Sequence, residues 1–255
     1  MTSKANLPAM AIIGASVSQF LNVFKGVFIY FWPFLILYLL KDYFVISSKT
    51  VGLQNATVIS LILSVVLFFC LVAVQICWYE KVITKQNFKY SFDKRSFVTL
   101  GYSLVISLFL VIGIVALTMF FGFTSKSGFL SSGFAITLTI LGGLFLLSLL
   151  VRFCLIFPAI AVNNNKTRIK RSWELTKGYH IKLFFMTFGF IFIIAIPGGI
   201  SNMVLTKTGL DSTFMFLLIM FFFNTFSLIS TLLVTEMVGR LFVFFHVPEK
   251  IKEYL

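Results

Sequence analysis

Long runs of apolar residues, separated by short polar stretches, dominate the pattern of this chain from about residue 27 onward. A helix needs about 20 consecutive apolar residues to cross the hydrocarbon core of a membrane, and six runs approach or exceed that length. Lys41 and Asp42 interrupt the first run and mark an alternative end for it. We therefore predict an all-α fold, a polytopic transmembrane helical bundle of about six spans in three hairpins, forming one integral membrane domain over 1–255. The predicted spans are 27–46, 56–78, 97–121, 133–153, 181–200 and 213–235, the last continuing as helix toward Phe245.

Two stretches outside these runs, 9–25 and 166–179, have the 3.6-residue periodicity of an amphipathic helix. We expect both to lie along the inner membrane interface as basic amphipathic helices. The first places Ile13, Val17, Phe20, Leu21 and Phe24 on an apolar stripe, opposite Ser18, Gln19, Asn22 and Lys25. The second places Lys166, Lys170, Glu174 and Lys177 opposite Ile169, Trp173 and Thr176.

Basic residues are concentrated in alternate loops between the predicted spans. One set of loops, which includes both termini, holds sixteen Lys and Arg residues, the other set holds four, and Arg152 falls within a span. Short loops rich in Lys and Arg stay in the cytoplasm. We therefore predict that both the N-terminus and the C-terminus are cytoplasmic. The four basic residues on the opposite side are Lys41, Lys49, Lys126 and Lys207.

Composition separates this chain from soluble proteins. It is 59% hydrophobic and 11% charged, with a mean hydropathy of +1.03, whereas soluble domains contain about 25% charged residues. The net charge of +13 does not indicate nucleic-acid binding, because the basic residues lie between apolar runs and not on a soluble face. The predicted partners are instead the phospholipid bilayer and the anionic lipid headgroups on its cytoplasmic side.

No motif for catalysis, cofactor binding or metal binding is found. The two histidines, His180 and His246, are far apart in sequence, and no Cys/His cluster has metal-ligand spacing. Cys70, Cys77 and Cys154 fall inside apolar runs, so no disulfide framework is predicted. A His-Glu-x-x-His sequence and a phosphate-binding glycine-rich loop are also absent. We therefore expect a protein that is not an enzyme and has no cofactor.

Two charges lie nearest the predicted hydrocarbon, Arg152 in the fourth span and Glu236 at the end of the sixth. Charges at this depth are costly and usually face the bundle interior, so we predict that these two form an intramembrane pair. The alternative is that Arg152 extends to the headgroups while Glu236 pairs with Arg240, one turn along its own helix. Asn224 is expected to hydrogen-bond between helices. The candidate lipid-headgroup contacts are Lys166, Arg168, Lys170, Arg171, Trp173 and Lys177.

One stretch carries a family resemblance. Arg152, Pro158 and Ala159, followed by Arg-Ser-Trp-Glu-Leu-Thr-Lys-Gly over 171–178, resemble a pattern in the uncharacterised bacterial YciC-like inner-membrane family. That family is related to the membrane domain of glycerophosphoryl diester phosphodiesterase. The resemblance implies a helical bundle in the bacterial inner membrane. It does not imply phosphodiesterase activity, which belongs in those relatives to a separate soluble domain that we do not find in this sequence.

These features predict a multi-pass inner-membrane protein that acts as a non-enzymatic accessory or scaffold in envelope or lipid homeostasis. The alternative is a small secondary transporter or lipid-handling permease. Glycines that interrupt the apolar runs at 142–143 and 198–199 are typical of broken transporter helices, although close helix packing and helix termination also explain them. A cavity lined by Arg152, Asn224 and Glu236 would favour the transporter. The sequence leaves open whether a membrane-protein partner or a homo-oligomer is involved.

Overall fold

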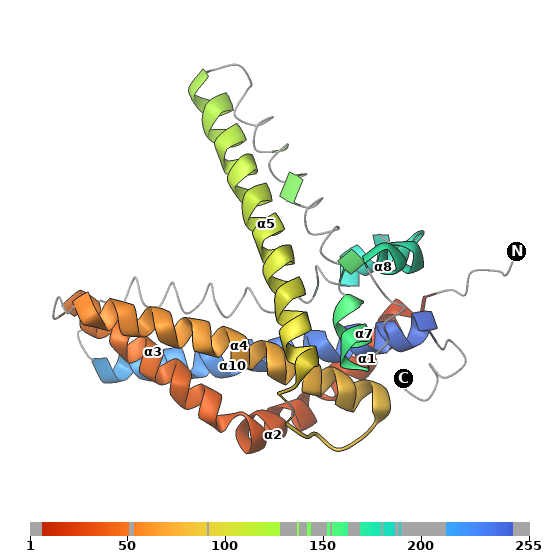
Figure 1. The fold of residues 1–255 in the computed structure, drawn as a ribbon, viewed down its shortest axis with the longest axis horizontal. Coiled ribbons are helices and arrows are strands. Elements are labelled where there is room, and N and C mark those ends of the chain that lie inside the picture. Colours follow the sequence, from red (N-terminus) through yellow and green to blue (C-terminus); the bar gives the residue numbers. More distant parts are fainter. Residues whose placement is uncertain are drawn as a thin grey trace, which may run out of the picture.

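The structure is a computed structural model that describes 7–50, 54–90, 92–127, 155–162, 169–179, 181–186 and 213–246, together with 137, 142–143, 152–153 and 189. The elements it describes are helices (Figure 1). They are α1 (Ala9–Ser18), α2 (Phe20–Tyr30), α3 (Trp32–Thr50), α4 (Gln54–Thr84), α5 (Lys94–Ser127), α7 (Ile156–Ala161), α8 (Ile169–Thr176) and α10 (Thr213–His246). The all-α prediction is confirmed for this part of the chain.

Three of the described helices are long and apolar enough to cross a membrane. Their qualifying segments are Asn55–Thr84, Lys94–Gly113 and Phe214–His246. They coincide with the spans predicted to begin at 56, 97 and 213, and α10 continues past Phe245 as expected. The spans predicted over 133–153 and 181–200 lie largely outside the described residues. The total of six spans in three hairpins therefore stays a prediction.

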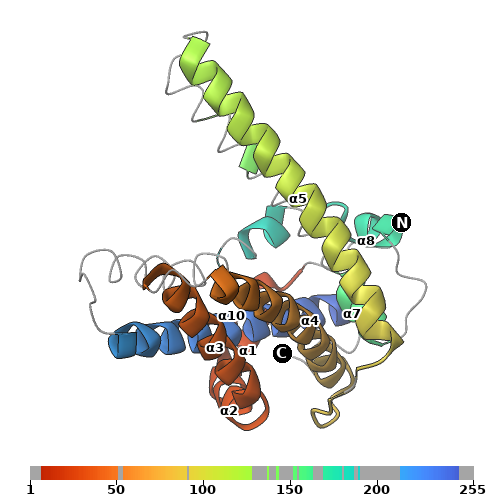
Figure 2. The same ribbon diagram turned by 60° about the vertical axis from the view of Figure 1, so that its left-hand side comes forward.

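Helices α3, α4 and α10 form the packed centre of the molecule. α3 and α4 run antiparallel, and α10 lies against both of them (Figures 1 and 2). α5 leaves this group at an angle, after contacting α4 and α7 near its start. Fully buried side chains of Trp78 on α4 and Leu232 on α10 occupy the centre, together with Phe31, whose ring centroid is 5.9 Å from that of Trp78. Near their carboxyl-terminal ends, α4 and α10 lie side by side, with Gly239 close to Val82 and Tyr79.

The continuous helix predicted over 27–46 is wrong at its start. The chain breaks at Phe31, between the end of α2 at Tyr30 and the start of α3 at Trp32. Pro33 explains the break, because proline has no backbone N–H and its ring would clash with the carbonyl of Ile29, four residues earlier. α3 also runs on to Thr50, so the charges at 41–42 do not end it.

The break leaves the Tyr30 carbonyl without its usual helical donor, because the Phe34 N–H bonds to the carbonyl of Phe31 instead. The Tyr90 hydroxyl, in the segment between α4 and α5, donates a hydrogen bond to that Tyr30 carbonyl. Partial burial, followed by the nearby sulfurs of Cys77 and Cys70, raises the pKa of Tyr90 to about 12. The hydroxyl therefore stays protonated and remains a donor at neutral pH.

The single amphipathic helix predicted over 9–25 is also wrong. α1 and α2 meet at Gln19 and their axes differ by 45°, a geometry that would also suit one broken span. Most of the predicted apolar stripe, including Leu21 and Phe24, is exposed, and a different face, with Ile12, Val23 and the small residues Ala15 and Gly26, is buried instead. Small residues let helix backbones approach closely. The face that packs is therefore mostly apolar or small, while Ser18, Asn22 and Lys25 of the polar face remain exposed.

Candidate functional site

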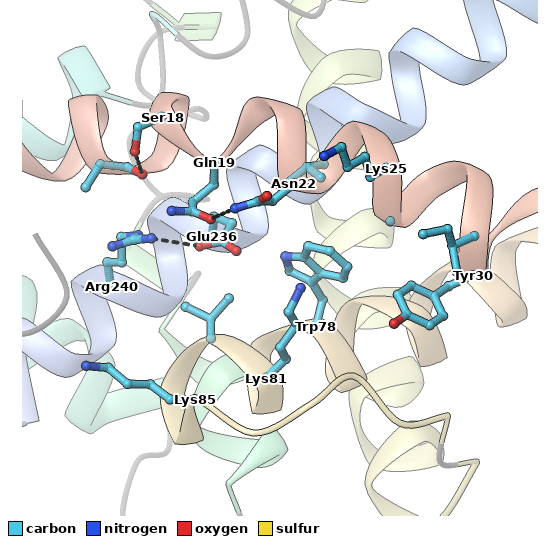
Figure 3. Close-up of a pocket in the computed structure, with 15 residues that line it drawn as sticks. Ser18, Gln19, Asn22, Lys25, Tyr30, Trp78, Lys81, Lys85, Glu236 and Arg240 are labelled. Atoms are coloured by element: carbon cyan, nitrogen blue, oxygen red, sulfur yellow. Dashed lines mark hydrogen bonds and ion pairs between the residues drawn. The ribbon is translucent and has the colours of Figure 1, made fainter.

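A cavity of about 580 Å³ lies where α1 and α2 pass the carboxyl-terminal ends of α4 and α10 (Figure 3). Four basic side chains and one carboxylate are among the described residues that line it. This imbalance makes the cavity a cationic site. Its polar and aromatic lining residues are Ser18, Gln19, Asn22, Lys25, Tyr30, Trp78, Lys81, Lys85, Glu236 and Arg240.

Helical spacing brings the functional groups of the cavity to one place. Trp78 and Lys81 lie three residues apart near the end of α4, and Lys85 follows with a left-handed backbone (φ 56°) just beyond the helix. Glu236 and Arg240 are one turn apart on α10. Residues three and four apart share a helix face, so each helix turns its own set toward the same space.

Inside the cavity, the Glu236 carboxylate pairs with Arg240, with 3.2 Å between Oε2 and Nη2. Both side chains are largely buried, at 7% and 11% exposure. The Lys81 ammonium lies 3.9 Å from the centroid of the Trp78 ring, a cation–π contact. Glu236 is therefore the one carboxylate that faces several cations in the described lining of this site.

Two buried donors at the cavity lack an acceptor. The Nε of Arg240 and the Nε1 of Trp78 have no hydrogen-bond partner among the described atoms. The Trp78 indole nitrogen faces the side of the cavity that holds Glu236 (Figure 3) and interacts with that carboxylate as a donor, but the geometry falls short of a well-formed hydrogen bond. A buried donor without a partner is unfavourable and calls for an explanation at each site.

The predicted pair of Arg152 with Glu236 does not form among the described residues. Glu236 contacts Arg240, the partner named in the alternative interpretation. The Arg152 guanidinium lies 4.0 Å from the ring centroid of Trp173 on α8, and the Ser172 hydroxyl donates to the Arg152 carbonyl. Glu236 and Arg240 are four residues apart on one helix, so their side chains meet whatever the arrangement of the other helices. A pair between Glu236 and Arg152 would need two helices to be aligned.

The predicted headgroup contacts lie on and beside α8. Lys170, Arg171, Trp173 and Lys177 are exposed there. Lys166 and Arg168 lie outside the described residues. α8 packs through Ser172 and Thr176, both fully buried, so its basic and aromatic residues remain at the surface. Contact with lipid headgroups stays a prediction for this helix.

A second polar cluster, which the sequence analysis did not identify, joins the end of α4 to the start of α5. Arg95 pairs with Glu80 at 3.1 Å and with Asp93 at 2.7 Å, and its Nη1 donates to the Ala161 carbonyl at 2.6 Å. Asp93 also accepts the backbone N–H of Arg95 at 2.9 Å, which is the geometry of a helix N-cap. In the sequence, Asp93 was a local signal of that cap. The contacts of Arg95 with Glu80 and Ala161 depend on tertiary structure.

A third polar contact lies in the packed centre. The Asn224 amide of α10 donates to the Asp42 carboxylate of α3 at 2.7 Å, and Lys41 pairs with the same carboxylate at 3.0 Å. Asp42 is 3% exposed and Asn224 6%. The interhelical hydrogen bond expected of Asn224 is therefore confirmed. Neither Asn224 nor Arg152 lines the cationic cavity.

In the described part of the chain, no group of three or more His, Cys, Asp and Glu residues is placed to hold a metal ion. The cationic cavity therefore remains the site with the clearest chemical character. Its functional interpretation rests on the sequence pattern and on this geometry. No protein family, curated protein or solved structure matches this chain.

Proposed function

We propose that the chain is a multi-pass protein of the bacterial inner membrane with both termini in the cytoplasm. In this proposal it binds anionic phospholipid at its cytoplasmic end and acts as a non-enzymatic accessory or scaffold in envelope or lipid homeostasis. The observation that carries the proposal is the convergence of Lys25, Lys81, Lys85 and Arg240 on one cavity. All four belong to the loops predicted to be cytoplasmic, and the YciC-like resemblance supports the same location.

The outer surfaces of the long helices support insertion in a bilayer. Leu61 on α4 is 67% exposed and Phe214 on α10 is 72% exposed. Large apolar side chains at such exposure would be unfavourable in water but suit hydrocarbon. In this proposal the six-span layout places these surfaces against lipid and the cationic cavity at the inner headgroup level, where anionic lipids attract basic residues.

A small secondary transporter or lipid-handling permease is the second candidate. The polar cavity with Glu236 in its lining favours it. Against it, Asn224 is occupied by Asp42 and Arg152 by Trp173, so the polar residues near the spans do not join into one lined pathway among the described residues. The scaffold is therefore the preferred proposal.

Cysteine labelling tests the insertion and its orientation. After replacement of Cys70, Cys77 and Cys154, single cysteines are introduced as Asn87→Cys, beyond α4, or Ser127→Cys, at the end of α5. A membrane-impermeant maleimide should label the Ser127 variant in intact spheroplasts, and the Asn87 variant only after permeabilisation, because basic loops stay inside. Labelling of the Asn87 variant in intact spheroplasts would overturn the assigned orientation.

Lipid analysis tests the proposed role. Protein purified in mild detergent from native membranes should carry anionic phospholipid at a higher fraction than the bulk membrane, and added salt should reduce that enrichment. Proteoliposomes should show no acceleration of lipid movement between leaflets. A lipid composition equal to the bulk membrane would contradict the proposal, and accelerated movement would favour the permease.

A further inference from the structure

The cationic cavity has more hydrogen-bond donors than acceptors. Arg240 uses Nη2 for Glu236 but leaves its buried Nε without a partner, and the fully buried Trp78 leaves Nε1 without one. Lys25 and Lys81 add two ammonium groups, against the carboxylate of Glu236. The Gln19 side-chain oxygen does not correct the excess, because it already accepts a hydrogen bond from the Asn22 amide at 2.8 Å.

A phosphate group matches this set of donors. Arginine and lysine bind phosphate oxygens through charge-assisted hydrogen bonds, which are stronger than neutral ones. An indole N–H can donate only, and the Trp78 N–H makes no well-formed hydrogen bond with the nearby Glu236, so a phosphate oxygen would give it a full acceptor. We infer that this cavity, between α1, α2, α4 and α10, binds a single phosphate group. The inference rests on the proposed function, because it names the ligand chemistry of the same site.

The rim of the cavity indicates a lipid as the source of that phosphate. Ile29 lines the cavity and is also 63% exposed, next to the exposed Phe28. An apolar rim at this point would let an acyl chain leave the cavity along the outer surface of α2 while its headgroup stays with the cations. A free phosphate or soluble phosphate ester has the same headgroup chemistry but gains nothing from the apolar rim.

Trp78 provides a direct signal for ligand in the cavity. In the double variant Trp32→Phe/Trp173→Phe, Trp78 is the remaining tryptophan of the chain. The full-length protein is placed in phosphatidylcholine nanodiscs at constant ionic strength. It is then titrated separately with inorganic phosphate and with phosphatidic acid added to the discs. A saturable change of Trp78 fluorescence is expected with at least one of the two probes.

Three substitutions in that background separate specific binding from general attraction. Lys81→Gln should weaken binding about tenfold or more, through loss of a charge-assisted contact. Glu236→Gln should tighten binding, because it removes the one described carboxylate of the lining but keeps an acceptor for Arg240. Lys94→Gln, an exposed cation outside the cavity, removes the same charge from the same predicted side and should leave the affinity within about twofold.

The outcomes are distinguishable. Saturation with phosphatidic acid at lower concentration than with inorganic phosphate identifies a lipid headgroup, and the reverse order identifies a soluble phosphate. An unresponsive Trp78, equal weakening by Lys81→Gln and Lys94→Gln, or weaker binding by Glu236→Gln would overturn the inference. In a protein that passes the cysteine-labelling test, such a result leaves the proposed membrane role intact. Failure of the labelling test removes that role itself.

Discussion

Replacing Gly239 by leucine is expected to separate α10 from α4 and to remove most of the folded protein. A Cβ atom at Gly239 would lie 2.9 Å from Val82 Cγ1, 3.4 Å from Val82 Cβ and 3.7 Å from Tyr79 Cδ1. The first of these separations is shorter than real carbon contacts, so the helices must move apart. Overpacking of a tight interface costs about 1–3 kcal/mol and occasionally more, and a leucine adds three further carbons to that clash.

The measurement is the free energy of unfolding in mixed micelles, followed by helix loss as denaturing detergent is added. Gly101→Leu on α5 is the matched control, because a Cβ there meets nothing within 4 Å. A rescue makes the test specific to the contact. Gly239→Ala should be destabilising alone, and Val82→Ala should recover much of that loss in the double variant. Equal stability of Gly239→Leu and Gly101→Leu would show that α4 and α10 do not meet at this point.

Replacing Asn224 by leucine should be the second large perturbation. The change removes the interhelical donor to Asp42, whose carboxylate is buried and keeps Lys41 as its remaining described partner. Removing one partner of a buried charged carboxylate costs about 3–5 kcal/mol of stability. The ion pair that Asp42 keeps with Lys41 lowers this cost. We expect a loss of about 2–3 kcal/mol in the free energy of unfolding.

Asn55→Leu, at an exposed position near the start of α4, is the control for this change. The double variant Asp42→Leu/Asn224→Leu should be more stable than the sum of its single losses, because removal of both partners leaves neither a buried carboxylate nor a buried amide without its hydrogen bond. Strict additivity of the two losses in the same unfolding assay would mean that the hydrogen bond contributes nothing of its own.

The long helices are the part of the fold that local sequence predicts well. α4 and α10 contain the apolar runs of their predicted spans and extend beyond them, because the length of an apolar run is itself the physical requirement for crossing hydrocarbon. The breaks at Gln19 and Phe31 were missed. Pro33 is a local signal for the second break, but the apolar run around it has the length of one continuous span, and run length alone does not register the missing N–H of one proline.

By itself, the sequence determined the helical class, the apolar lengths and the placement of most cations in alternate loops, since each depends on residues close together in the chain. Only the tertiary structure decided which polar groups meet. Glu236 had two possible partners in the sequence; it contacts Arg240 on its own helix, and the tertiary structure places the other candidate, Arg152, against Trp173. Lys25, Lys81 and Arg240 are far apart in the chain, and the cavity they share exists because α1 and α2 pass the carboxyl-terminal ends of α4 and α10. Loop charge alone cannot specify that convergence, because it predicts a side of the membrane and not which residues are neighbours.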